Sequence, residues 1–354
     1  MNKPGKTPPR GGETPPSRYW LIRVAFFFIL LAMPVLLLAA FEFGARRYFR
    51  DVLSTSHGRD YFFQKNHHLF KAEKNGFGLR GAEIRERTGQ TYRVVVLGDS
   101  FAWGQGIHPY TSRFPEVAEK LFKERYPGAD FEVINVGAPG LNLGAHNKLL
   151  PFVINLDPDF VLYQWYVNDM EEFVDVPAFH TETLVPGKMR HLELMNRSVT
   201  YILLFRAWNQ VRTALGLQMP YSRYLADKMH DPESKASRWA DKALHELITS
   251  LQGWNIATGI VLFPENRSDM SRYELAFLHD RVLAECQRDK ITCLDLREAY
   301  AAYNGRRAEL QANPLDGHPS KIAHRLAAER IVETFGPDWQ AAMAKRAGHK
   351  EARQ

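Results

Sequence analysis

Residues 94–100, with the sequence Val-Val-Val-Leu-Gly-Asp-Ser, constrain the fold more than any other part of the chain. This apolar run, rich in β-branched residues, predicts a strand of a parallel sheet that stops abruptly at Gly98. Open α/β folds place their chemistry at the carboxyl ends of such strands. Ser100 is therefore a candidate nucleophile; its alternative role is to cap the helix that follows.

Similar runs recur along the chain. Predicted strands at residues 93–97, 131–134, 160–165, 258–263 and 291–296 alternate with helical patterns near residues 113–126, 144–155, 236–252 and 273–288. We expect a three-layer α/β/α fold with a five-stranded parallel sheet. The insertion at residues 170–235 is longer than a plain connection in such a fold, and we expect it to carry substrate selectivity. Within it, the helical pattern at residues 199–217 either packs on the domain or forms a lid that faces lipid or acyl groups.

A serine nucleophile needs a base that takes its proton and donors that hold the oxyanion. The loop at residues 313–320 is rich in turn-forming residues and places Asp316 two positions before His318. In that loop the carboxylate could hold the imidazole in the tautomer that accepts the serine proton. A histidine before proline is otherwise ordinary in a loop, so the pair gains meaning only together with Ser100.

Two loops that follow predicted strands offer candidate oxyanion donors. At residues 135–142, glycine lets a backbone N–H approach a ligand closely. At residues 166–169, the amide of Asn168 could donate to a developing negative charge. Taken alone, each loop is also ordinary turn chemistry, because loops prefer Gly, Pro, Asn and Asp.

In order and in placement at strand ends, these segments resemble the SGNH or GDSL hydrolase superfamily from residue 75 to residue 335. The resemblance implies that Ser100, within Gly-Asp-Ser-Phe, is the nucleophile and the first oxyanion donor. It implies that Gly140 and Asn168 complete the oxyanion hole, and that Asp316 and His318 are the acid and the base. It also implies a flavodoxin-like form of the fold. Residues 75–81 resemble a lead-in that is common in membrane-anchored members.

The chain departs from the family's pattern at two places. Tyr166 stands where the third block usually has glycine, and its side chain, like that of Trp103, is a candidate for lining the substrate pocket. Asp316 and His318 are separated by Gly317 alone, a spacing that resembles the branch of the superfamily that O-acetylates sugar polymers. That spacing hints at acyl transfer, although a shorter turn serves hydrolysis equally well.

The apolar stretch at residues 24–41 reaches the length needed to cross a bilayer, especially with residues 19–22. It predicts a membrane anchor; a cleaved signal peptide is the competing interpretation, but its apolar core is usually shorter. Basic residues on both sides nearly cancel the positive-inside signal. We expect the N-terminus inside, and the resemblance to envelope-modifying hydrolases implies a catalytic domain in the periplasm or outside the cell.

These patterns divide the chain into five parts. We expect a disordered basic tail at residues 1–18, a transmembrane anchor at 19–42, a linker and lead-in at 43–90, a catalytic domain at 91–340 and a C-terminal tail at 341–354. Charged residues up to Arg23 supply +4 of the formal net charge of +6. The remainder is too nearly neutral to argue for nucleic-acid binding.

Several polar residues have structural interpretations. Cys286 and Cys293 either pair across a helix-to-strand turn or pack as two buried thiols, and we expect thiols. Asp99 and Asp169 are expected to bond turn amides rather than form a paired-carboxylate site. His324 is expected to face solvent. No cysteine and histidine cluster in the sequence has metal-ligand spacing, so we expect neither a metal nor a cofactor.

The resemblance thus implies a membrane-anchored serine esterase that removes acyl groups, in particular acetyl groups, from an extracytoplasmic glycan through an acyl-serine intermediate. O-acetyl transfer by the same triad and hydrolysis of lipid esters are the alternatives within this class. A different alternative is a catalytically silent glycan-binding or scaffold subunit of an envelope complex; the complete set of catalytic residue types argues against it. The expected partners are an acylated glycan or small ester and the membrane.

Overall fold

The computed structural model describes residues 18–48, 74–172, 194, 198–313 and 316–351. Five parallel strands form one sheet in the order β2-β1-β3-β4-β5. They are β1 (Tyr92–Leu97), β2 (Phe131–Asn135), β3 (Phe160–Trp165), β4 (Ala257–Leu262) and β5 (Thr292–Asp295). The predicted α/β class and five-stranded parallel sheet are confirmed, and no predicted strand end is wrong by more than one residue.

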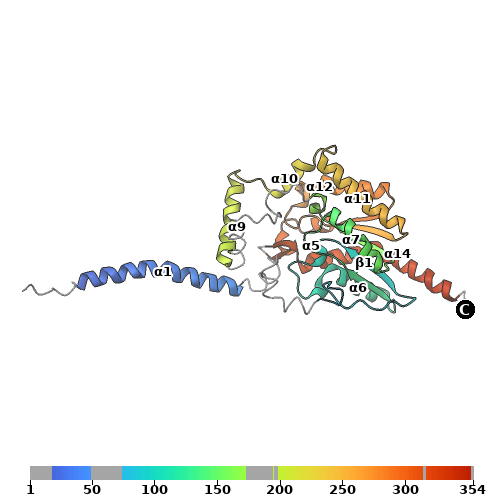
Figure 1. Ribbon diagram of the computed structural model, residues 1–354, viewed down its shortest axis with the longest axis horizontal. Helices are drawn as coiled ribbons and strands as arrows, with labels where there is room; N and C mark the ends of the chain where they lie inside the picture. Colours follow the sequence, from blue (N-terminus) through green and yellow to red (C-terminus); the bar gives the residue numbers. More distant parts are fainter. Residues whose placement is uncertain (1–17, 49–73, 173–193, 195–197, 314–315, 352–354) are drawn as a thin grey trace, which may run out of the picture.

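Helices cover both faces of the sheet (Figure 1). Helices α6 (Phe114–Arg125) and α14 (Lys321–Glu351) cover one face, and α7 (Leu143–Asn155), α11 (Lys235–Gly253) and α12 (Ala276–Arg288) cover the other. Alternate residues of β1 serve the two cores: Val94 and Val96 contact the α6 and α14 side, whereas Val95 and Leu97 contact the α7 side. Successive side chains of a strand point to opposite faces, so an apolar strand fills both cores. The three-layer arrangement is therefore confirmed.

The strand order fixes where a site can form. From β1 the chain crosses to β2 on one side and then to β3 on the other, so the connections diverge beyond the carboxyl ends of β1 and β3. Sheets of this order hold ligands at that divergence. The helix α5 (Ser100–Trp103) follows β1 there, and the 3₁₀ helix η2 (Val167–Met170) follows β3.

A small hairpin outside the sheet completes this edge. After β5 the chain forms α13 (Arg297–Ala301) and the 3₁₀ helix η5 (Arg307–Leu310). Strand β6 (Gln311–Asn313) then pairs antiparallel with β7 (Asp316–Pro319). Helix α5 contacts β7, which brings the C-terminal loop to the end of β1.

The N-terminal helix α1 (Arg18–Tyr48) contains a stretch, Trp20–Tyr48, that is long and apolar enough to cross a membrane by length and composition. Its apolar side chains are exposed, so it is not a core helix of the domain. Pro34 lies within it. The predicted tail at residues 1–17 and the part of the linker at residues 49–73 lie outside the described residues.

The described part of the insertion forms two helices that pack differently. Helix α10 (Tyr221–Met229) buries Leu225 and Met229 in the core beside α11. Helix α9 (Val199–Ala214) buries Val199 and Ile202 in a separate cluster with Ala45 of α1. The sequence thus predicted the helix, but α9 packs on α1 rather than on the domain core.

Helix α14 continues through residues 341–351 of the expected C-terminal tail, and its apolar residues as far as Met343 pack on the domain core. Two other sequence predictions are wrong. Cys286 and Cys293 form a disulfide, since the turn from α12 to β5 brings their Cα atoms to 6.2 Å. His324 is buried, not solvent-facing, because α14 presents it to α6, where its Nδ1 accepts the N–H of Phe114 at 3.1 Å.

Candidate active site

Ser100 begins α5 at the turn that ends β1. Asp99 caps this helix: its Oδ1 accepts the N–H of Phe101 at 2.8 Å, as predicted for a carboxylate that bonds a turn amide. From β3, Oε1 of Gln164 accepts the N–H groups of Asp99 and Ala102, both at 3.1 Å. The turn is therefore held from within and from the neighbouring strand, which fixes the place of the serine.

Two glycines allow α5 to sit this close to the sheet. A Cβ at Gly98 would lie 2.5 Å from Oε1 of Gln164 and 2.8 Å from Cβ of Ala102. A Cβ at Gly137, after β2, would lie 2.6 Å from Cβ of Ala102 and 2.7 Å from the backbone N of Trp103. Only glycine lets backbone and neighbouring groups approach so closely.

His318 meets Ser100 across 218 positions of sequence, with Nε2 of the imidazole 2.9 Å from Oγ of the serine. The imidazole comes from β7, and the ring of Phe101 lies edge-on to it with centroids 5.5 Å apart. From the loop after β4, Nδ2 of Asn266 donates to the carbonyl of Gly317 at 2.8 Å. A buried asparagine thus holds the backbone next to His318.

Asp316 lies in β7, and its backbone pairs with Asn313 of β6. Its side chain is outside the described part of the chain. The role of Asp316 as the acid that orients His318 therefore stays a prediction.

Asn168 lies in η2, whose geometry depends on Asp169. One carboxylate oxygen of Asp169, Oδ2, accepts the N–H of Tyr166 and the hydroxyl of Tyr163, both at 2.9 Å. The other, Oδ1, lies 3.3 Å from Nε2 of His146. Asp169 thus bonds a turn amide as predicted and holds Asn168 at the end of β3. Within the described ranges, the buried Oδ1 of Asn168 has no hydrogen-bond partner.

Gly140 lies in an exposed turn between β2 and α7, with φ at 79°, a conformation that favours glycine. A Cβ there would meet no atom within 4 Å, so the turn is open. Gly137, which packs against α5, already donates its N–H to Oδ1 of Asn135 at 2.9 Å. Of these two amides, the predicted one at Gly140 lies in the open part of the loop.

Tyr166 and Trp103, the predicted pocket residues, make different contacts. The ring of Tyr166 stacks on Phe101 at a centroid distance of 4.2 Å, and Phe101 in turn contacts the imidazole of His318. The ring of Trp103, the last residue of α5, lies under the guanidinium of Arg80, 4.7 Å away. Tyr166 is therefore linked to the histidine through Phe101, whereas Trp103 packs against the lead-in segment.

The lead-in segment supports α5 from behind. Oδ1 of Asn75 accepts the N–H groups of Phe77 and Leu79, both at 3.0 Å, which shapes the turn. The turn directs the buried Arg80 toward α5, where it donates to the carbonyls of Trp103 at 3.1 Å and Gly104 at 3.0 Å. A guanidinium at the carboxyl end of a helix stabilises its unpaired carbonyls.

The carboxyl group of Asp99, next to Ser100, is destabilised in its charged form. Burial, and secondly the charge of Asp169, raise the pKa of Asp99 to about 6. In the described part of the chain, Oδ2 of Asp99 has no hydrogen-bond partner, so one oxygen of the group gains nothing from the fold. A positive charge on His318 lowers the pKa of Asp99 and partly offsets this effect.

Sequence reasoning missed three residues that shape this site: Gln164, Arg80 and Asn266. Asn266 had a usable signal, because it lies in the polar loop that follows a predicted strand. Gln164 lies inside an otherwise apolar strand, and a buried amide in such a strand is itself unusual. Arg80 had no signal beyond its place in the lead-in.

One group of described residues has metal-ligand types within reach of one another, and it lies away from this site. Ligand atoms of His245, Glu285 and Asp289, on α11 and at the end of α12, lie within 4.8 Å of one another. The guanidinium of Arg288 pairs with Glu285 and lies 3.0 Å from Nδ1 of His245. Because the guanidinium of Arg288 already pairs with these groups, their arrangement is that of an ion-pair cluster.

No protein-family model matches the chain, and no curated protein matches it in sequence. Among solved structures, the chain is similar to the acetylxylan esterase Axe2 from Geobacillus stearothermophilus, with 15% identity over 70% of this chain and 95% of that chain and a TM-score of 0.45. It is also similar to a G-D-S-L family lipolytic protein from Veillonella parvula, with 15% identity over 69% and 98% of the two chains and a TM-score of 0.41. The lipase/acylhydrolase from Enterococcus faecalis gives 14% identity over 69% and 95%, with a TM-score of 0.43. Similarities of this size assign no activity, so a function has to rest on the chain's own residues.

Proposed function

We propose that the protein is a serine hydrolase of ester bonds, in which Ser100 attacks the acyl carbonyl and His318 is the base. The main support for this proposal is the 2.9 Å distance between Oγ of Ser100 and Nε2 of His318. At that distance the imidazole takes the hydroxyl proton as the Oγ–carbon bond forms, then gives it to the departing alcohol. Water, activated by the same imidazole, cleaves the acyl-serine ester to release the acid and restore the hydroxyl.

The oxyanion of the tetrahedral intermediate needs preorganised donors. We assign this role to the backbone amides of Ser100 and Gly140 and to the side-chain amide of Asn168. The position of Asn168 supports this, because η2 follows β3 at the carboxyl edge of the sheet and Asp169 fixes its turn by accepting the N–H of Tyr166. Asp316, two residues before His318, is assigned to orienting the imidazole.

The substrate class in this proposal is an ester-linked acyl group, in particular acetyl, on an extracytoplasmic glycan. The ring of Phe101, which stacks on Tyr166, lies beside the imidazole and takes up volume there, which favours a small acyl group. The apolar helix α1 supports a membrane anchor. The disulfide between Cys286 and Cys293 supports a domain outside the cytoplasm, where disulfides persist.

The test is release of nitrophenol from acetyl, butyryl and octanoyl esters by the full chain in mild detergent, with and without an added glycan acceptor. Ser100→Ala and His318→Gln are compared with Ser271→Ala, which removes an exposed hydroxyl on η4 (Met270–Arg272). We expect turnover with acetyl esters that both site variants lose by about a thousandfold or more and the control keeps.

Each other outcome selects an alternative. Faster release with an acceptor shows acyl transfer, and preference for octanoyl esters shows a lipid esterase. Turnover that survives Ser100→Ala refutes the serine mechanism, and the absence of any turnover leaves the silent scaffold subunit.

A further inference from the structure

Helix α9 carries an exposed apolar stripe. Leu204, Trp208, Val211 and Leu215 are 63%, 58%, 46% and 67% exposed. Their spacing of four, three and four residues places them on one face of the helix and its C-terminal cap. A row of large apolar side chains on one helix face marks an interaction surface.

The opposite side of α9 is fastened to α1. Glu42 accepts the N–H groups of Val199 at 3.0 Å and Thr200 at 2.8 Å, and the hydroxyl of the cap residue Ser198 at 3.0 Å. A carboxylate at a helix N-terminus is favoured by both the free amides and the helix dipole. Val199 and Ile202 then bury against Ala45 of α1. The position of α9 is thus set by the anchor helix itself.

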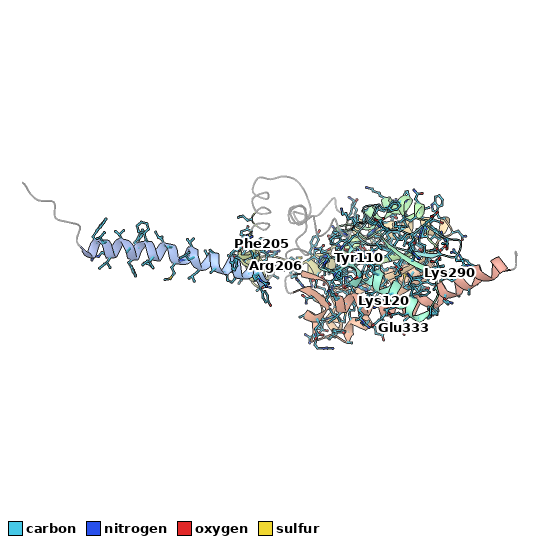
Figure 2. The ribbon with its side chains drawn as sticks, turned by 90° about the horizontal axis from the view of Figure 1, so that it is seen from below. Tyr110, Lys120, Phe205, Arg206, Lys290 and Glu333 are labelled. Atoms are coloured by element: carbon cyan, nitrogen blue, oxygen red, sulfur yellow. A yellow bond between two sulfur atoms is a disulfide. The ribbon has the colours of Figure 1, made fainter. Side chains whose placement is uncertain are left out.

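Glu42 directly follows the apolar run at residues 24–41, so it marks the level at which α1 leaves the hydrocarbon. Helix α9 runs across the direction of α1 from this level (Figure 1), and in the view of Figure 2 the labelled Phe205 and Arg206 of α9 overlap the C-terminal end of α1. A helix that crosses a spanning helix at its exit from the bilayer lies along the membrane surface.

The charge of α9 fits an anionic surface. Between Val199 and Ala214 the helix contains Arg206 and Arg212 and no acidic residue. Tryptophan, leucine and valine on one face, with arginine elsewhere, are typical of helices that lie in the lipid headgroup region. Trp208 lies in the middle of the stripe, and tryptophan is enriched at this depth.

We propose that α9 is an interfacial helix, which inserts its Leu204–Trp208–Val211–Leu215 stripe into the outer part of the same bilayer that α1 crosses. The inference rests on the anchor in the proposed function, but not on the esterase. It gives the domain a second contact with an anionic membrane, so that the domain cannot swing freely about α1.

The test is site-specific fluorescence in vesicles of zwitterionic and anionic phospholipid that hold the full chain. Single cysteines at Leu204, Trp208 or Gln210 carry an environment-sensitive dye; Gln210 is exposed on the far side of α9 from the stripe. A fourth variant, with its single added cysteine at Val35, reports on α1, where the Val35 side chain is exposed. Both native cysteines are engaged in the disulfide and take no label. Brominated acyl chains quench dyes in lipid, and aqueous iodide quenches dyes in water.

We expect strong quenching by brominated lipid and a blue-shifted emission at Leu204 and Trp208, with quenching by iodide at Gln210. Protection of Leu204 and Trp208 from both quenchers would show that protein covers the stripe and would overturn the inference. Quenching of these two positions by iodide alone would do the same. If brominated lipid does not quench the dye at Val35, α1 does not span the bilayer, and the inference is refuted together with the anchor. The esterase proposal is tested separately, by the release of nitrophenol.

Discussion

Replacing Asp99 by asparagine tests the electrostatics next to Ser100. Burial and the nearby Asp169 raise the pKa of Asp99 from 3.8 to about 6 in the folded protein. Because the folded-state pKa is the higher one, folding favours the protonated carboxyl. The stability from this group is fully present below pH 4 and is lost as the pH rises through 6. Asparagine keeps an oxygen for the N–H of Phe101 and cannot ionise.

The size of the effect follows from the two pKa values. Their difference of about 2 pH units corresponds to about 3 kcal/mol between strongly acid solution and pH 8. Roughly 1 to 1.5 kcal/mol of this develops between pH 5 and pH 8, the range in which both proteins can be compared. The unfolding free energy of Asp99→Asn, measured relative to the wild type, should rise by that amount from pH 5 to pH 8.

Urea unfolding of the full chain in mild detergent, followed by tryptophan fluorescence at both pH values, measures this difference. Asp338→Asn, an exposed carboxyl on α14, is the matched control and should show no change with pH. Equal effects of Asp99→Asn at pH 5 and pH 8 would refute the reasoning, since Asp99 would then ionise in the folded protein as an exposed carboxyl does.

Three further changes have expected outcomes. Gly98→Ala forces a Cβ to within 2.5 Å of Gln164 and should lower the unfolding free energy by about 3 kcal/mol, while Gly89→Ala, with open space around it, stays within about 0.5 kcal/mol in the same urea titration. Asn266→Ala releases the carbonyl of Gly317 and should lower kcat about 10- to 100-fold with KM nearly unchanged; a rise in KM alone would show that Asn266 does not position the base. Glu42→Ala removes the acceptor of the first two N–H groups of α9 and should weaken that helix by about 1 to 2 kcal/mol, seen as faster amide exchange than in the wild type in α9 and not in α11; exchange in α9 that is the same as in the wild type would show that Glu42 does not hold the helix.

The sheet could be predicted because each strand is a short apolar run bounded by turn residues, and burial on both faces leaves that pattern unbroken. Ser100 could be proposed from the rule that chemistry collects at strand ends. The 2.9 Å approach of His318 could not, because the hairpin that carries it lies outside the sheet, and no periodicity encodes its direction. The resemblance to a known family, not the spacing, supplied that pairing.

The wrong predictions share a physical cause. A helical pattern shows which face is apolar but not which element covers it, so the sequence left two positions open for α9, on the domain or as a lid, and did not include its contact with α1. Likewise, His324 reads as polar in sequence, yet as a neutral imidazole it fits the core by accepting a backbone N–H. Burial, and then the charge of Arg113, lower its pKa to about 3, which keeps it neutral. The path of a short turn, which joins Cys286 to Cys293, is also invisible to periodicity.

The position of the hairpin in the chain has a consequence for biogenesis. The serine follows the first strand, but the imidazole arrives 218 residues later, after the fifth strand. A chain synthesised from the N-terminus therefore carries its serine through most of synthesis before His318 is made. Under the proposed mechanism, the nascent protein cannot hydrolyse esters until the hairpin of β6 and β7 forms. Premature termination before β7 would therefore give a protein that carries the anchor but has no esterase activity.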